Sequence, residues 1–344
     1  MIVREVLDQE KDKFEAVTSH PLQSWAWGEF RKATGVEIIR LGAFDGQSLL
    51  SSYQISTHLV PKLGWRIGYF PKGGQPDERQ IFALKTAAQK YSLLFIKNEP
   101  NFYAPAETND PQLEASRKFL EQNQSELGRP MFTPYSYVLG LNNSADQLFA
   151  NLKQKTRYNV NLAQKSGVQV VQDDSDQGFE EYIKLWKQTT KRQEFYSHDE
   201  KYHRLMWKHM RQDNIAHLLK ATYQGKTLGI WILFIYKNIL YYPYGASSRE
   251  NKEVMANNLL AWEAIKFGQA QNCYLFDMWG SLGPNPDKDD PWYGFHRFKA
   301  GYGGTLMEYI GTYDYIQDPQ RYQLFKILDT WRWKLLRLRS KLPF

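Results

Sequence analysis

The hydrophobic pattern of the chain runs twice through the same order of elements. Each run reads as a strand, a tight turn, a returning strand, a third strand, an amphipathic helix and a short apolar closing strand. In the first run these elements are predicted at residues 37–44, 45–46, 49–57, 65–70, 77–90 and 93–96. In the second run they are predicted at residues 216–223, 224–225, 228–236, 239–244, 257–267 and 274–276. The pattern therefore indicates an internal duplication.

The ends of the elements also match between the two runs. Asp45-Gly46 and Gln224-Gly225 each predict a turn between the first two strands. Glu99 follows the first closing strand, Asp277 follows the second, and Gly268 stands where it can end the second helix. This order of elements is compatible with a mixed α/β fold of the acyltransferase type, although a fold alone does not set a function.

A polar break at residues 142–144 separates the two runs. We therefore predict a first domain at residues 1–143 and a second domain at residues 144–317. A basic amphipathic helix is expected at residues 318–344. The second domain opens with a predicted helix that starts near Ala145 and is rich in lysine and arginine.

The composition limits the classes of protein to consider. The chain has 344 residues, of which 42% are hydrophobic, and this is enough to build real cores. Its single cysteine, Cys273, excludes an intrachain disulfide and argues against a cysteine-based zinc site. We expect a cytoplasmic protein, because no run approaches a membrane span or a secretory signal. The net charge of +7 suits anionic partners, but a mildly basic soluble protein explains it equally well.

Several short strings fall at or near the ends of the predicted elements. They occupy residues 24–31, 69–74, 97–100, 155–168, 189–202, 242–247, 276–280 and 298–304. Their order and spacing resemble the FemA/FemB/FemX family of peptidoglycan bridge-forming aminoacyltransferases, and the resemblance covers nearly the whole chain. The most telling string is Phe298-Lys299-Ala300-Gly301-Tyr302-Gly303-Gly304. The stretch from Tyr202 to Asn214 leaves no room for the helical arm of FemA-like members, so the chain is closer to the compact FemX type.

The resemblance implies a fold and an activity. The fold would be two tandem GNAT-like (acyl-CoA N-acyltransferase-like) domains with mixed sheets and a cleft, and the C-terminal helix would pack back on the first domain. The activity would move an amino acid from aminoacyl-tRNA to the stem-peptide amine of a peptidoglycan precursor, either UDP-MurNAc-pentapeptide or lipid II. No cofactor and no metal are implied, and a monomer is expected.

The resemblance also implies which residues hold the precursor. They are Trp27, Arg31, Lys72, His198, Tyr202, Tyr244 and Phe298. Arg31 suits a diphosphate because its planar guanidinium donates two hydrogen bonds at once. His198 stands where the family has an arginine, and a histidine is not reliably charged at neutral pH. Taken without the resemblance, Arg31 is a solvated helix residue and Tyr244 a packed tyrosine at a strand end.

The implied catalytic residues are Lys299 and Glu99. Lys299 lies where the aminoacyl ester is attacked in the family, and a fixed cation there stabilises an oxyanion. Glu99 would accept the proton of the attacking amine, although a structural ion pair explains it as well. Three cations are expected to contact tRNA, namely Lys155, Arg157 and Lys165. A solvated basic helix is the simpler explanation of these three.

Two other functions stay open. The fold is shared with acyl-CoA-dependent N-acyltransferases, although residues 71–74 match a pyrophosphate loop poorly. A non-catalytic protein that binds RNA or membrane is the second alternative. Apolar residues recur at helical spacing in residues 331–344 beside five cations, so this tail either lies on anionic lipid or packs on the first domain.

Overall fold

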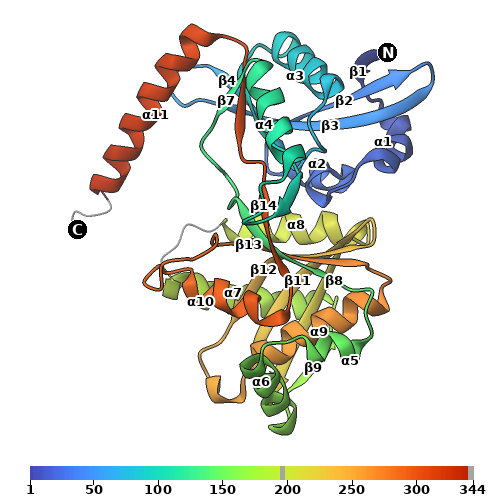
Figure 1. Ribbon diagram of the computed structural model, residues 1–344, viewed down its shortest axis with the longest axis vertical. Coiled ribbons are helices and arrows are strands. Elements are labelled where there is room, and N and C mark those ends of the chain that lie inside the picture. The colour runs from blue at the N-terminus through green and yellow to red at the C-terminus, as the bar shows by residue number, and fades with distance from the viewer. Residues whose placement is uncertain (194–197, 340–344) are drawn as a thin grey trace.

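The computed structural model describes the backbone of residues 1–193 and 198–339 and the side chains of residues 1–191 and 198–332. The chain forms two lobes, each built around one mixed sheet, and the lobes meet at the middle of the molecule (Figure 1). In the described residues, no helix is both long enough and apolar enough to cross a membrane.

The first sheet has seven strands. In spatial order they are β1 (Ile2–Glu5), β2 (Glu37–Asp45), β3 (Ser48–Leu59), β4 (Arg66–Pro71), β5 (Leu93–Glu99), β15 (Tyr313–Ile316) and β7 (Ser125–Leu127). Only β4 and β5 pair in parallel. Helix α3 (Glu78–Lys90) makes the crossover between them, as a parallel connection requires. Its apolar side, with Ala83, Leu84 and Ala87, packs on Ile55 and Ile96 of the sheet.

The second sheet has eight strands. In spatial order they are β6 (Tyr103–Pro105), β14 (Thr305–Tyr309), β8 (Tyr135–Gly140), β13 (Leu275–Ser281), β12 (Ile239–Ser247), β11 (Lys226–Tyr236), β10 (Ala216–Tyr223) and β9 (Gln169–Gln172). Here only β12 and β13 pair in parallel, and α9 (Ala256–Ala270) joins them. The two lobes therefore share one plan, which confirms the predicted repeat and the mixed α/β class.

The two sheets exchange strands. Strand β8 follows the first run in sequence but lies beside β13 in the second sheet. Strand β15 follows the second run but lies beside β5 in the first sheet. The division of the chain after residue 143 stays a prediction, because sheet membership crosses it in both directions.

The remaining helices cover the faces and the ends of the lobes. They are α1 (Lys11–Val17), α2 (Trp25–Ala33), α4 (Pro111–Gln122), α5 (Ala145–Ala150), α6 (Gln154–Lys165), α7 (Asp176–Gln193), α8 (Glu200–Gln212), α10 (Tyr293–Lys299) and α11 (Pro319–Arg339). Residues 213–215 join α8 directly to β10, so no helical arm is inserted there. Helix α2 of the first lobe packs against α8 of the second.

Three predicted details were wrong. Gly268 does not end α9 but lies inside it, where a Cβ atom would approach Leu141 Cδ1 to 2.8 Å. The basic helix that was expected from Ala145 is two helices, because the chain breaks after α5 and Lys153 N donates to Gly301 O. Asp277 does not follow the closing strand but lies in the middle of β13.

The first turns of α11 pack back on the first lobe, as expected. Tyr322 is buried, and its ring lies 5.2 Å from that of Phe95 on β5. Phe325, one turn further on, lies 5.0 Å from the same ring. The part of the tail from residue 340 to 344 lies outside the described residues.

Candidate active site

A cavity of about 280 Å³ opens where the two lobes meet. Helix α2 and strand β4 line it from the first lobe, and α8, β12 and β13 line it from the second. Its walls include five of the predicted precursor-binding residues, namely Trp27, Arg31, His198, Tyr202 and Tyr244. Sequence positions more than 200 residues apart are thus brought to one site, which is the arrangement expected of a substrate cleft.

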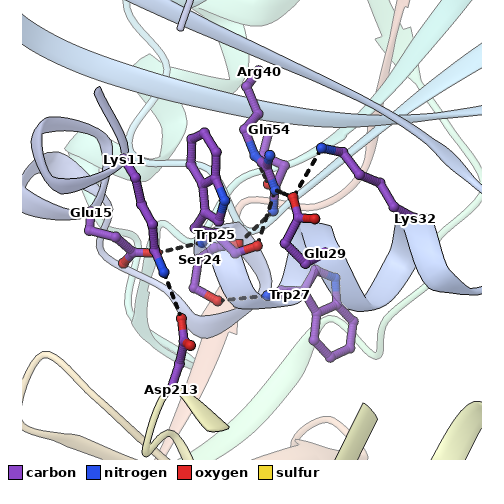
Figure 2. A network of polar contacts seen from close by, with 10 residues as sticks. All are labelled: Lys11, Glu15, Ser24, Trp25, Trp27, Glu29, Lys32, Arg40, Gln54 and Asp213. Atoms are coloured by element: carbon purple, nitrogen blue, oxygen red, sulfur yellow. Dashed lines mark hydrogen bonds and ion pairs between the residues drawn. The ribbon is translucent and has the colours of Figure 1, made fainter. Parts of the chain in front are cut away.

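A buried polar network holds α2 against the first sheet (Figure 2). Ser24 caps the helix, because its Oγ accepts from Trp27 N at 3.1 Å. Arg40 donates to Gln54 Oε1 at 2.8 Å and to Trp25 O at 3.1 Å, and pairs with Glu29 at 2.9 Å. Burial lowers the pKa of Arg40, while Glu29 opposes that change. The network fixes the helix that carries Trp27 and Arg31 into the cavity.

Two contacts from the same region reach the second lobe. Lys11 pairs with Asp213, which directly follows α8, at 3.2 Å (Figure 2). Glu15 accepts hydrogen bonds from Trp25 N and from the hydroxyl of Tyr236 on β11. These contacts tie the segment around α1 and the start of α2 to the second lobe.

Arg31 lies in the cavity with an unsatisfied donor. Its Nε is buried and has no hydrogen-bond partner among the described residues. A buried guanidinium donor without an acceptor is costly, and an anionic group of a ligand would remove that cost. The positive charge of Arg31, together with desolvation, also lowers the pKa of His198.

The second lobe contributes a pair of phenols. The hydroxyls of Tyr202 and Tyr244 lie 3.2 Å apart, and the His198 ring stacks on Tyr202 at 3.6 Å. Phe30 of α2 meets Tyr202 edge to face at 4.8 Å. Burial raises the pKa of Tyr202, with Tyr244 and Arg31 opposing it, so the phenol stays neutral and can donate hydrogen bonds.

Trp279 forms another wall of the cavity and has an unusual backbone. Its φ is 64°, a region that bulky side chains rarely adopt. It lies in a β-bulge, where the register of β13 against β8 shifts between Asp277 and Gly280. Asp277 Oδ1 accepts the Trp279 N–H at 2.8 Å, and the Trp279 carbonyl turns toward α10. No role was predicted for Trp279, because nothing in a Met-Trp-Gly string marks a positive φ.

Lys299 lies next to the cavity but does not line it. Its side chain is only 1% exposed, and its Nζ donates to Gly280 O at 2.6 Å and to Trp279 O at 3.1 Å. The Phe295 ring lies 3.9 Å from Nζ. Burial lowers the pKa of Lys299 to about 7, and the charge of Asp277 opposes this. A side chain that is half deprotonated near neutral pH is suited to chemistry on a substrate.

Glu99 also lies behind the wall of the cavity. Its Oε1 accepts from Met131 N at 2.7 Å and from Thr312 Oγ1 at 2.6 Å, and Oε2 accepts from Tyr69 at 2.5 Å. Phe132 N is a fourth donor, at 3.2 Å. The carboxylate itself does not line the cavity, but three residues that donate to it do, namely Tyr69, Met131 and Phe132. These donors argue against Glu99 as the direct proton acceptor, a role that stays a prediction.

Lys72 is buried outside this cavity. Its φ is 54°, and its Nζ lies 3.4 Å from the centre of the Tyr309 ring. Burial lowers the pKa of Lys72 to about 8, while Asp277 and Glu99 oppose that change. Because the side chain lies among rings instead of in the cavity, its contact with a precursor stays a prediction.

The remaining predicted residues surround Lys299 or lie on α6. Phe298 packs in the core of the second lobe, 6.2 Å from Trp231. Lys155 and Lys165 are exposed on α6, whereas Arg157 donates to the carbonyls of Ala150 and Leu152 at the end of α5. The start of α6 touches the segment that follows Lys299, because Lys153 N donates to Gly301 O at 2.9 Å.

Comparison with known proteins assigns this arrangement to a family. The profile of the FemAB family matches residues 7–224 and 210–330, which is most of the chain. The chain belongs to the FemAB family. This FemAB protein is 23% identical, over 93% of its length and 94% of the relative's, to a lipid II:glycine glycyltransferase of Staphylococcus haemolyticus.

Solved structures support the fold of this FemAB protein. A crystal structure of FemX matches this chain with a TM-score of 0.79 and 20% identity, and the match covers 94% of this chain and 99% of the FemX chain. A tandem GNAT protein from the clavulanic acid biosynthesis pathway matches 91% of the chain and 97% of its own, with a TM-score of 0.53 and 10% identity. The predicted family and the tandem GNAT-like fold are therefore confirmed.

Proposed function

We propose that this FemAB protein transfers an aminoacyl group from aminoacyl-tRNA to the stem-peptide amine of a peptidoglycan precursor, during synthesis of the interpeptide bridge. The precursor would be UDP-MurNAc-pentapeptide or lipid II. Family membership supports the class of reaction, and the named relative acts on lipid II and glycine. The shared cavity between the lobes supports a reaction that joins two large substrates.

The cavity would hold the acceptor. Arg31 offers a buried, unsatisfied donor for a diphosphate oxygen. The phenols of Tyr202 and Tyr244 offer neutral hydrogen-bond donors beside it, and the indoles of Trp27 and Trp279 offer apolar faces for a sugar ring. One fixed cation with neutral donors suits a diphosphate that is linked to a sugar.

Lys299 would act on the aminoacyl ester. The stem-peptide amine attacks the ester carbonyl, an amide C–N bond forms, and the C–O bond to the tRNA ribose breaks. The amine loses a proton, and the ribose oxygen leaves as a hydroxyl. The Lys299 ammonium would stabilise the oxyanion that forms between these steps, since a preorganised cation in a dry site is effective there.

The donor tRNA would approach from the side of α6. This helix begins beside Gly301, two residues after Lys299, and carries Lys155 and Lys165 in exposed positions. Exposed cations on one helix suit a phosphate backbone. Arg157 would contribute less, because its guanidinium already binds two carbonyl groups of the chain.

One observation carries the proposal. The indole of Trp279 lines the acceptor cavity, and its carbonyl accepts a hydrogen bond from Lys299. Lys299, which is proposed to act on the donor ester, therefore contacts a residue that forms part of the wall of the acceptor site. Such proximity is what converts two bound substrates into a reacting pair.

The direct test supplies purified protein with a panel of charged, labelled tRNAs and each of the two precursors. Label that appears in the stem peptide supports the proposal, and the panel identifies the amino acid and the acceptor. Absence of transfer from every charged tRNA, together with acetyl transfer from acetyl-coenzyme A to an amine with release of coenzyme A, would overturn it in favour of an acyl-CoA-dependent N-acyltransferase.

A further inference from the structure

One side of α11 exposes a continuous row of apolar side chains. Leu324, Ile327, Leu328 and Trp331 follow one another at spacings of three, one and three residues, so they share one side of the helix. They are 47%, 56%, 39% and 60% exposed, respectively. We refer to these four residues as the outer stripe. In Figure 1 the C-terminal half of α11 stands out from the side of the first lobe.

The opposite side of α11 packs on the first lobe. Tyr322 is fully buried, and Phe325 packs beside it on Phe95 of β5. Asp329, which also points to this side by helical spacing, lies 3.9 Å from Arg129. The outer stripe is therefore not the packing face of the helix. It is a second apolar face, and contiguous exposed apolar surface usually marks an interaction site.

The charges around the outer stripe are of one sign. At ~100° per residue, Arg321 and Arg332 fall along one edge of the stripe. The two acidic residues of this region, Asp318 and Asp329, fall on the packing side. An apolar stripe with cations along its edge and no acid is typical of a helix that lies in a lipid interface.

We propose that the outer stripe of α11 docks this protein on the surface of an anionic membrane. The apolar side chains enter the interface, and the flanking cations contact lipid phosphates. A second copy of the chain fits this face less well, because two such helices would bring rows of cations together with no acid between them. The proposal is independent of the transfer reaction, because docking uses neither tRNA nor precursor.

The test is flotation of the full-length protein with vesicles. One set contains phosphatidylglycerol and phosphatidylcholine in equal parts, and the other contains phosphatidylcholine alone. We expect the protein to float with the anionic vesicles and not with the neutral ones. The double variant Ile327→Ser with Trp331→Ser should lower the bound fraction at least about tenfold, because it removes two of the four anchoring side chains.

A matched control removes similar apolar surface elsewhere. Leu50 and Leu59 on β3 are 44% and 70% exposed, so the double variant Leu50→Ser with Leu59→Ser should float as the unchanged protein does. Circular dichroism confirms that each variant is folded. Equal flotation of the α11 variant and the unchanged protein would overturn the proposal. So would a dimer in sedimentation, without vesicles, that the α11 variant abolishes.

Discussion

The ammonium of Lys299 donates a hydrogen bond to the carbonyl oxygen of Trp279, and the indole of the same tryptophan lines the cavity that contains Arg31. Trp279 lies in a β-bulge and has a φ of 64°. This backbone conformation lets one residue contact both Lys299 and the cavity. Strained backbone of this kind persists where the surrounding structure holds it, and it is frequent at active sites. We therefore expect Lys299 and Trp279 to affect different kinetic constants of the same reaction.

Replacing Lys299 by methionine should lower turnover strongly and leave the fold intact. Methionine keeps the length of the buried side chain but removes the charge, so the oxyanion loses its cation. We expect kcat to fall about 10²–10³-fold, measured as transfer of a labelled aminoacyl group. Lys252→Met is the matched control, since Lys252 is exposed on the same lobe. Normal turnover in Lys299→Met would reject the catalytic role.

The rate should depend on the protonation of Lys299. Burial lowers its pKa to about 7, so the ammonium form predominates below that pH and is lost above it. If the ammonium stabilises the oxyanion, kcat/KM should fall as the pH rises through about 7. A rate that instead rises through the same pH would show that the neutral amine acts, as a base. Lys299→Met should remove this limb of the profile in either case.

Trp279 should govern acceptor binding through its ring. Trp279→Ala removes a cavity wall, and we expect KM for the precursor to rise about tenfold, which corresponds to ~1.4 kcal/mol. Trp279→Phe keeps an aromatic face toward Phe132, whose ring lies 6.0 Å away, and should recover most of the loss. Alanine keeps the backbone carbonyl that accepts a hydrogen bond from Lys299, so the alkaline limb of the pH profile should stay in place in the alanine variant. An unchanged KM would contradict this assignment.

Much of the fold is predictable from the local periodicity of the apolar residues. Strands β2, β3, β10 and β11 lie within a few residues of their predicted bounds, since alternating apolar residues and Gly-containing turns encode them directly. The exchange of β8 and β15 between the sheets is not predictable in this way. Sequence pattern gives the order of elements but not which of two similar sheets a short strand joins.

The site was predicted only in part. A resemblance to short family strings identified Arg31, Tyr202 and Tyr244, and the structure places all three in one cavity. It could not show that Lys299 would lie behind Trp279, since a single positive φ depends on the tertiary contacts of a bulge. Nor could the resemblance predict that four donors surround Glu99, because two of them are backbone groups of residues 131–132.

His198 is the departure from the family pattern that is simplest to test. Desolvation and the nearby Arg31 lower its pKa, so the ring is neutral at pH 7, and Arg31 is the one fixed cation among the described residues that line the cavity. His198→Arg should lower KM for a diphosphate-linked precursor about tenfold, because a charge-assisted hydrogen bond is added. Lys201→Arg, an exposed position on α8, serves as the control. A higher KM in His198→Arg would show that its stack on Tyr202 matters more than charge.

The polar network beneath α2 should contribute measurably to the free energy of unfolding. Arg40 is 6% exposed and donates to Gln54, Trp25 and Glu29, so Arg40→Met removes this donor from two buried acceptors, Gln54 Oε1 and Trp25 O, and from the half-exposed Glu29. We expect the free energy of unfolding to fall by about 3 kcal/mol, measured by denaturant titration. Lys32 pairs with the same Glu29 at 3.0 Å but is largely solvated, so Lys32→Met should cost no more than about 0.5 kcal/mol. Equal losses in the two variants would show that burial of Arg40 contributes nothing beyond a surface ion pair.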